Sequence, residues 1–156
     1  MASLNQTYPP DWNRRPPQMP LEDFGVWREF LARRGREWRG YAYDVELHGG
    51  DTPIASTDPG TARAWARAIA KRIDVVAVRD TGYTLIEVRH NARNATLGQI
   101  QVYARMFPLD YPAERLEGLL IVCETIDRDV LNVARSIGVD VWSTLAERAQ
   151  PQLGGP

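Results

Sequence analysis

Cysteine and histidine are scarce in this sequence. Among 156 residues there is one cysteine, Cys123, and there are two histidines, His48 and His90. A lone cysteine excludes a disulfide within the chain, and its place after the apolar run 119–122 predicts a buried core thiol rather than a nucleophile. The two histidines lie far apart without metal-ligand spacing, and we expect His90 in an exposed loop just after a strand.

Charge of one sign and long apolar runs are also missing. The 19 Lys and Arg residues against 20 Asp and Glu residues give a net charge of −1, which excludes an overall basic field for holding nucleic acid. Any contact with nucleic acid therefore needs a local basic patch. No apolar run approaches the roughly 18 residues of a membrane span, and the N-terminus lacks a signal-peptide pattern, so we expect neither membrane insertion nor secretion.

Length and composition predict one folded domain with an extended arm in front of it. The chain is 44% hydrophobic, which suits a globular core. Residues 1–20 instead hold five of the eleven prolines and little apolar content, so they cannot fold alone. They carry the aromatic residues Tyr8 and Trp12, which would anchor such an arm either on its own domain or on a neighbouring subunit. We predict a domain over residues 21–149 and a tail over 150–156.

Hydrophobic periodicity predicts an α/β domain with a mixed central sheet flanked by helices. Helical spacing marks four segments, and β-type patterns mark five others. The helices are expected at 21–34, 61–70, 95–107 and 127–137, and the strands at 41–47, 72–78, 83–89, 118–123 and 139–142. In the third helix, Gly98 should allow close approach to the sheet, and Pro108 should end the helix.

The two central strands each place one carboxylate among apolar residues. A tight turn containing Gly82 joins two β-branched runs, which predicts a hairpin. If the hairpin is symmetric about Asp80 and Thr81, Asp74 faces Glu87, and residues opposite each other point to the same side of the sheet. Two such carboxylates form a minimal site for Mg²⁺ or Mn²⁺. The alternative is that both are solvated on an exposed face.

The hairpin and the helix after it resemble the core of the PD-(D/E)XK nuclease superfamily. Asp74 matches the family's first acid, and Glu87 with Arg89 matches its (D/E)-x-K element. Gln99 and Tyr103, one turn apart on one helix face, match the branch with a Gln-x-x-x-Tyr helix. The resemblance implies a restriction-endonuclease-like fold, Mg²⁺ or Mn²⁺ held by the two acids, and hydrolysis of DNA phosphodiester bonds.

The sequence departs from this family at the lysine, which is Arg89 here. Arginine can stabilise charge on a phosphate, but it is bulkier and never loses its proton. The chain has 18 arginines and one lysine, so a bias toward arginine also accounts for the change. A further acid on the first helix is common in such nucleases, which makes Glu29 a candidate third metal ligand or else a solvated side chain. The best candidates for a phosphate-facing patch are Arg33, Arg34, Arg36 and Arg39.

Two functions fit these features. One is a metal-dependent nuclease, in which Asp74 and Glu87 bind the metal, Arg89 stabilises charge, and Gln99 and Tyr103 orient the site. The other is a structural or adaptor protein that keeps the fold without the reaction.

The sequence favours the adaptor function. The chain as a whole resembles small bacteriophage-encoded proteins, sharing a Trp-rich first helix, an Arg-Ile-Asp-Val-Val strand and an Ala-x-Leu-Gly-Gln helix. This resemblance implies a virion component near the head–tail junction or in the tail, found in the virion or the host cytoplasm. Residues 1–20 would then contact other virion proteins or further copies of the chain. The arginine at the lysine position, the lack of basic charge and the Pro-rich arm support this function.

Overall fold

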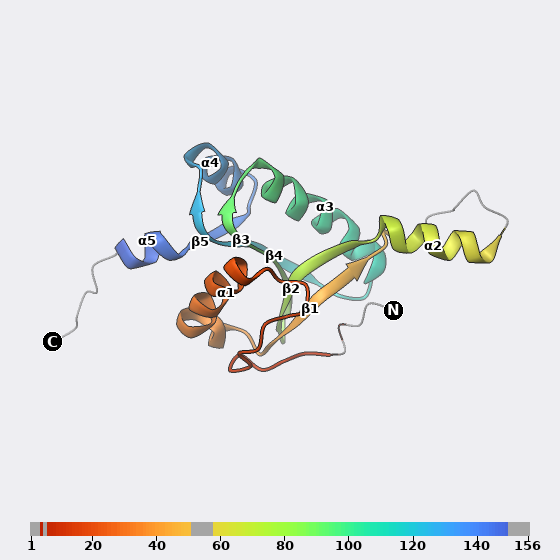
Figure 1. The fold of residues 1–156 in the computed structure, drawn as a ribbon, viewed down its shortest axis with the longest axis horizontal. Coiled ribbons are helices and arrows are strands. Elements are labelled where there is room, and N and C mark those ends of the chain that lie inside the picture. Colours follow the sequence, from red (N-terminus) through yellow and green to blue (C-terminus); the bar gives the residue numbers. More distant parts are fainter. Residues whose placement is uncertain (1–3, 5, 51–57, 150–156) are drawn as a thin grey trace.

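The computed structural model describes residue 4, residues 6–50 and residues 58–149 (Figure 1). These residues form an α/β domain whose five-stranded mixed sheet is flanked by helices, as the periodicity predicts. In chain order the elements are α1 (Leu21–Arg34), the 3₁₀ turn η1 (Gly35–Glu37), β1 (Gly40–Leu47), α2 (Pro59–Ile69), β2 (Lys71–Arg79), β3 (Gly82–Ala92), α3 (Asn94–Asp110), β4 (Leu116–Ile126), α4 (Arg128–Ser136), β5 (Asp140–Ser143) and α5 (Thr144–Ala149).

The sheet has the strand order β1-β2-β3-β4-β5, so every strand lies beside its neighbour in sequence. The first three strands are antiparallel, and the pairs β3–β4 and β4–β5 are parallel. The two parallel connections run through α3 and α4, as crossovers between parallel strands require. In the hairpin Val78 pairs with Tyr83, which confirms the predicted register.

Each face of the sheet packs against its own helices, and Figure 1 shows α1 and α3 on opposite sides of the strands. Trp27 and Phe30 of α1 are fully buried against one face. On the other face, Tyr103 and Phe107 of α3 pack over the strands. Burying a large apolar side chain stabilises the fold by about 1.5–3 kcal/mol, so these contacts fix both helices on the sheet. Across residues 58–149 and the described part of the first fifty, no helix has the length and apolar character of a membrane span.

Strands β2 and β3 separate in the middle of the sheet, and we call this opening the fork. The pairing of β2 with β3 reaches as far as Val75 and Ile86. Beyond that point β2 stays paired with β1, and β3 stays paired with β4. Helix α3 links the strand pair β3–β4 to the strand pair β1–β2, because it starts just after β3 and ends at Asp110. The Asp110 carboxylate accepts backbone N–H groups from the loop after β1, at 2.7 Å from His48 and 2.7 Å from Gly50.

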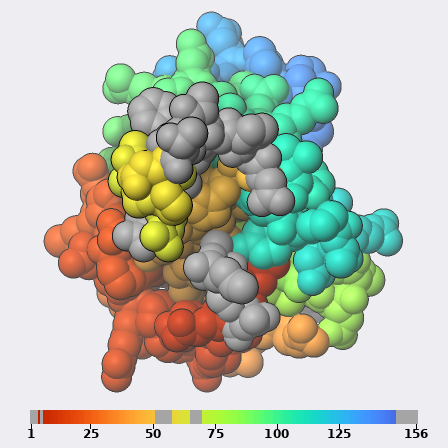
Figure 2. All heavy atoms as spheres, turned by 90° about the vertical axis from the view of Figure 1, so that its right-hand side faces the viewer, coloured from red at the N-terminus to blue at the C-terminus, as the bar shows by residue number. Residues whose placement is uncertain are grey.

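Beyond the end of β1, helix α2 extends away from the sheet (Figure 1). Figure 2 shows α2 in yellow at this end of the molecule, between α1 in orange and the second half of α3 in teal. The Asp58 carboxylate accepts the Thr61 backbone N–H at 2.7 Å and so caps the start of this helix. The side chains of residues 65–69 lie outside the described part of the structure.

Some boundaries differ from the predictions. Pro108 lies inside α3 and does not end it, because a proline so near the C-terminus removes only one backbone hydrogen bond. Gly98 does not bring α3 close to the sheet, since a Cβ added there would meet no atom within 4 Å. Strand β3 continues to Ala92, which places His90 in a strand and not in a loop. The short helix α5 was not expected.

The described part of the N-terminal arm lies on its own domain. Tyr8 and Tyr41 exchange two backbone hydrogen bonds of 2.8 and 2.9 Å, so the arm covers the edge strand β1. The ring of Trp12 packs between Tyr8, at 4.2 Å, and Tyr43, at 5.1 Å. Met19 is buried at the end of the arm. Contact with another subunit through residues 1–20 stays a prediction.

Candidate active site at the strand fork

The guanidinium group of Arg89 stands at the centre of the fork. Its Nη1 donates to Oδ2 of Asp74 at 2.8 Å, and its Nη2 donates to Glu87 and, at 3.1 Å, to Gln99 Oε1. Four of the five residues that the sequence singles out therefore meet at one group. Both acids converge on Arg89, although the β2–β3 pairing ends at Val75 and Ile86 and does not pair Asp74 with Glu87 as the symmetric hairpin predicted.

The fork itself explains why acids gather there. Past the last β2–β3 pair, backbone N–H groups of β3 no longer face carbonyl groups of β2 and need other acceptors. Asp74 accepts the Val88 N–H at 3.0 Å, and Asp23 accepts the His90 N–H at 2.6 Å. These two carboxylates complete the edge of β3 in addition to surrounding Arg89.

The acid of α1 that reaches the fork is Asp23, and not the predicted Glu29. Oδ2 of Asp23 lies 3.9 Å from Nη1 of Arg89, whereas Glu29 forms an ion pair with Arg33 at 3.7 Å. The two acids lie six positions apart, so their side chains point about 120° apart around the helix axis and cannot both face the fork. The sequence held a signal for Asp23, which lies four residues before the buried Trp27 and so on the apolar stripe.

Burial has the largest influence on the ionisation of these acids. Glu87 is 0% exposed, and burial raises its pKa to about 8, with the Asp74 charge adding to the rise. The pKa values of Asp74 and Asp23 are also raised, again chiefly by burial. Arg89 opposes these rises without cancelling them, so burial shifts Glu87 toward its protonated form. The second oxygen of Glu87, Oε2, is buried and has no hydrogen-bond partner in the part of the chain that the structure describes.

Tyr103 lies beside this cluster without a hydrogen bond to it. Its side chain is buried in the apolar layer under α3 together with Phe107. Burial raises the pKa of the phenol, and the charges of Glu87 and Asp74 add to this effect. Tyr103 is therefore close enough for the charges of the acids to influence its pKa, and it stays protonated.

A divalent metal would have two carboxylate ligands here. Within the described residues, no group of three or more His, Cys, Asp and Glu side chains is arranged to hold a metal ion. Mg²⁺ commonly uses one or two carboxylates and completes its octahedron with water and substrate phosphates. Asp74 and Glu87 supply this donor set, and Oε2 of Glu87 has no hydrogen-bond partner among the described residues. The residues present therefore fit Mg²⁺ or Mn²⁺.

The predicted basic patch near the end of α1 is largely neutralised. Arg34 binds the Glu37 carboxylate with two nitrogens, one at 2.7 Å, and Arg39 binds Asp80 at 2.9 Å. Arg33 pairs with Glu29 on α1. Of the four predicted arginines, Arg36 has no such partner among the described residues. The patch therefore offers little net charge to a phosphate backbone.

Comparison with known proteins does not extend this description. No family model matches the chain, and no curated protein matches it. A crystal structure described as a protein of unknown function, AF1548, matches with a TM-score of 0.44 and 16% sequence identity. The match covers 77% of this chain and 56% of that protein, so this chain spans little more than half of its length. The interpretation of the fork therefore depends on its geometry.

Proposed function

We propose that the fork is the active site of a PD-(D/E)XK-type nuclease, which hydrolyses DNA phosphodiester bonds with Mg²⁺ or Mn²⁺. The main support is the meeting of Asp74, Glu87 and Gln99 on the Arg89 guanidinium, from two strands and a helix. Carboxylates, a cation and an amide in one place can hold a metal and stabilise charge that develops on a phosphate.

Each residue has a role in this proposal. Asp74 and Glu87 would hold the metal, which would supply Lewis-acid chemistry and activate a water. Arg89 contacts the phosphate and stabilises its negative charge; it does not act as a base, because arginine keeps its proton. Gln99 orients the guanidinium through its hydrogen bond of 3.1 Å. Tyr103 holds α3 in place beside the acids.

A second candidate is the adaptor function in a bacteriophage virion, with the fold kept and the reaction lost. One observation favours it. Arg89 already engages both acids and so occupies them with an internal cation. In this alternative the cluster only stabilises the sheet at the fork, and residues 1–20 contact other virion proteins or copies of the chain.

A cleavage assay separates the two functions. Single- and double-stranded DNA are incubated with the protein in Mg²⁺, Mn²⁺ or EDTA, using wild type, Asp74→Ala, Glu87→Ala and the control Asp129→Ala. The control removes an exposed acid of α4. The nuclease proposal expects metal-dependent cleavage that both fork variants lose and the control keeps. It also expects Arg89→Lys to cleave at least as fast as wild type. Folded wild-type protein that leaves all DNA intact in both metals would rule out the nuclease.

A further inference from the structure

Residues 59–73 carry positive charge and no acid, and we call them the basic segment. The cations of this segment are Arg63, Arg67, Lys71 and Arg72. Asp58 stands directly before the segment, and Asp74 of the fork stands directly after it. In the structure the segment forms α2, the linking residue Ala70 and the start of β2. A chain of net charge −1 therefore concentrates positive charge next to its proposed active site.

The acids close to the basic segment already have partners. Asp58 caps the start of α2, where it accepts a backbone N–H at 2.7 Å. Glu46 on the neighbouring strand β1 forms an ion pair with Arg72. Arg63 on α2 and Lys71 on β2 are exposed, and neither forms an ion pair with another described residue. These two cations can therefore bind an anion that comes from outside the chain.

Helix α2 would gain stability from such a partner. It has 11 residues, and isolated helices shorter than about 12–15 residues are marginal in water. Figure 1 shows α2 extending beyond the end of β1 and away from the sheet. In Figure 2 it stands between α1 and the second half of α3. These are the two helices whose side chains Asp23 and Gln99 reach the fork.

The basic segment leads directly into the fork. Lys71 precedes Asp74 by three strand positions, or about 10 Å, because a strand rises roughly 3.3 Å per residue. From there α2 extends the cationic surface by about 16 Å. On the other side of the fork, residues 88–109 also contain no Asp or Glu. A polyanion whose phosphate lies at Arg89 can therefore continue along the basic segment without meeting like charge from either segment.

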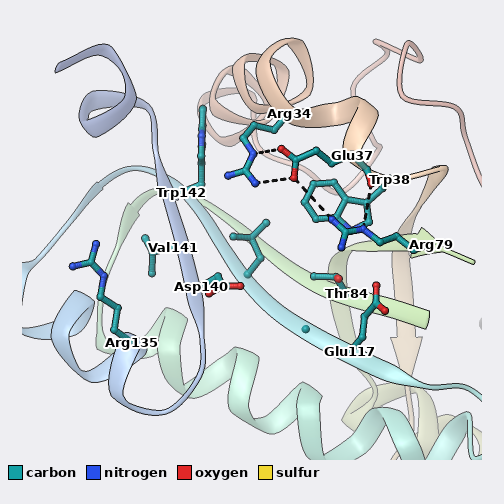
Figure 3. A pocket seen from close by; sticks show the side chains of 12 residues that line it. Arg34, Glu37, Trp38, Arg79, Thr84, Glu117, Arg135, Asp140, Val141 and Trp142 are labelled. Atoms are coloured by element: carbon teal, nitrogen blue, oxygen red, sulfur yellow. Dashed lines mark hydrogen bonds and ion pairs between the residues drawn. The ribbon is translucent and has the colours of Figure 1, made fainter. Parts of the chain in front are cut away.

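A second arginine-rich surface, around a pocket of about 600 Å³ between η1 and α4, is electrically balanced. It is lined by Arg34, Arg79 and Arg135 and by the acids Glu37, Glu117 and Asp140. Figure 3 shows Glu37 between Arg34 and Arg79, and its carboxylate forms an ion pair with each of them. This pocket therefore offers no net charge to a polyanion, in contrast to the basic segment.

We propose that the basic segment binds the phosphate backbone of DNA beside the fork, with Arg63 and Lys71 donating to phosphate oxygens. The proposal rests on the nuclease function of the fork and adds where the substrate is held. DNA fits this surface because its regular row of negative charges matches cations spread along a helix and a strand. Contacts of this kind position the DNA and do not read its sequence.

Fluorescence anisotropy of a labelled DNA duplex, and of one of its strands, tests this contact in the full chain. The titrations contain EDTA, so that metal-dependent cleavage does not occur. Arg63→Ala and Lys71→Ala should each weaken binding about fivefold, which corresponds to the roughly 1 kcal/mol between unit charges about 4 Å apart in water. Each variant should also make the dependence of log K on log salt concentration shallower, by about 0.9 for a duplex or about 0.7 for a single strand.

Two further variants separate phosphate contact from a structural role. Arg63→Lys keeps the charge and should restore both the affinity and the salt dependence, whereas alanine at this position preserves the helix, since it has the highest helix propensity. The matched control is Arg128→Ala, which removes an exposed arginine of α4 and should bind DNA like wild type. Tighter binding of the duplex identifies double-stranded DNA as the ligand, and tighter binding of the strand identifies single-stranded DNA.

The outcomes for the basic segment and for the fork are distinct. Folded wild type that binds no DNA would overturn the contact, and so would an unchanged affinity and salt dependence in both alanine variants. Labelled polyglutamate that binds more tightly than DNA would also overturn it, because an acidic protein would then be the better partner. DNA that is bound through the basic segment but stays intact in Mg²⁺ and Mn²⁺ would overturn the nuclease and keep the contact.

Discussion

Two glutamates of this protein each contact an arginine, and their pKa values move in opposite directions. Glu37 at η1 has a side chain that is 39% exposed, and its hydrogen bond from Arg34 lowers its pKa. Glu87 at the fork is fully buried against Arg89, and burial raises its pKa to about 8. An arginine beside an acid therefore does not by itself tell how that acid ionises.

Water accounts for the difference. At η1 one carboxylate serves two partly exposed arginines, Arg34 and Arg79, and solvent hydrates all three groups. At the fork three carboxylates share the one guanidinium of Arg89. A buried ion loses several kcal/mol of hydration, whereas an exposed pair gains about 0–1 kcal/mol. The fork is thus a cluster with surplus acid, which suits binding of a further cation.

The largest expected effect comes from removing the shared cation. Arg89→Ala should lose about 3 kcal/mol of stability at pH 8.5, because it leaves buried acids uncompensated. The loss should shrink at pH 5, which lies below the raised pKa of Glu87 of about 8, because protonated Glu87 needs no compensating charge. Urea unfolding at both pH values measures this. The control Arg34→Ala should lose about 1 kcal/mol or less of stability. Equal losses in the two variants would contradict the difference between the buried acids of the fork and the exposed ion pair at η1.

Metal binding should come next in size. The fork proposal expects Mn²⁺ at 100 times its Kd to stabilise wild type by about 2.7 kcal/mol, or roughly 5–10 °C in Tm. Binding should release a proton from Glu87, which calorimetry in buffers of different ionisation enthalpy detects. Glu87→Gln should abolish both effects, and Glu37→Gln should change neither. A Tm shift that survives in Glu87→Gln would place the metal elsewhere.

The pH dependence of stability should separate the two glutamates. The pKa of Glu87 is raised from 4.5 to about 8, so its contribution to stability is fully present below pH 4.5 and is lost as the pH rises to about 8. Glu87→Gln, which mimics the protonated acid, should flatten the fall in stability across this window. The pKa of Glu37 is lowered, so its contribution is present above pH 4.5 and is lost at more acid pH. Above about pH 4.5, Glu87→Gln should therefore be more stable than wild type and Glu37→Gln less stable, and both variants should approach wild type at acid pH.

The local parts of the fork could be predicted from the sequence. The turn before Gly82 set the hairpin register, which holds as far as Val75 and Ile86 and so brings Asp74 and Glu87 to the next position along the two strands. Helical spacing placed Gln99 one turn before Tyr103. These predictions needed only the order of residues in a strand, a turn or a helix, and Arg89 and Gln99 do meet at 3.1 Å.

The parts that depend on packing could not be predicted. Choosing Asp23 over Glu29 required the rotation of α1 on the sheet, which the buried Trp27 and Phe30 determine. The raised pKa of Glu87 required the depth of the fork, and no sequence pattern encodes where β2 leaves β3. The ion pairs that neutralise the arginines around η1 were also not predicted, because they join residues that lie on different elements, such as Arg79 and Glu37.

The smallest expected effect is the coupling between Arg34 and Glu37. A double-mutant cycle with Arg34→Ala and Glu37→Ala should give about 0.2–1 kcal/mol in low salt, as for other exposed pairs. In 1 M NaCl, where the screening length falls to about 3 Å, this coupling should nearly vanish. The cycle of Asp74→Ala and Arg89→Ala should keep most of its larger coupling, since salt ions screen buried pairs poorly. A fork coupling that fades with salt as fast as the η1 coupling would mean that water reaches the acids, and burial could then not raise the pKa of Glu87.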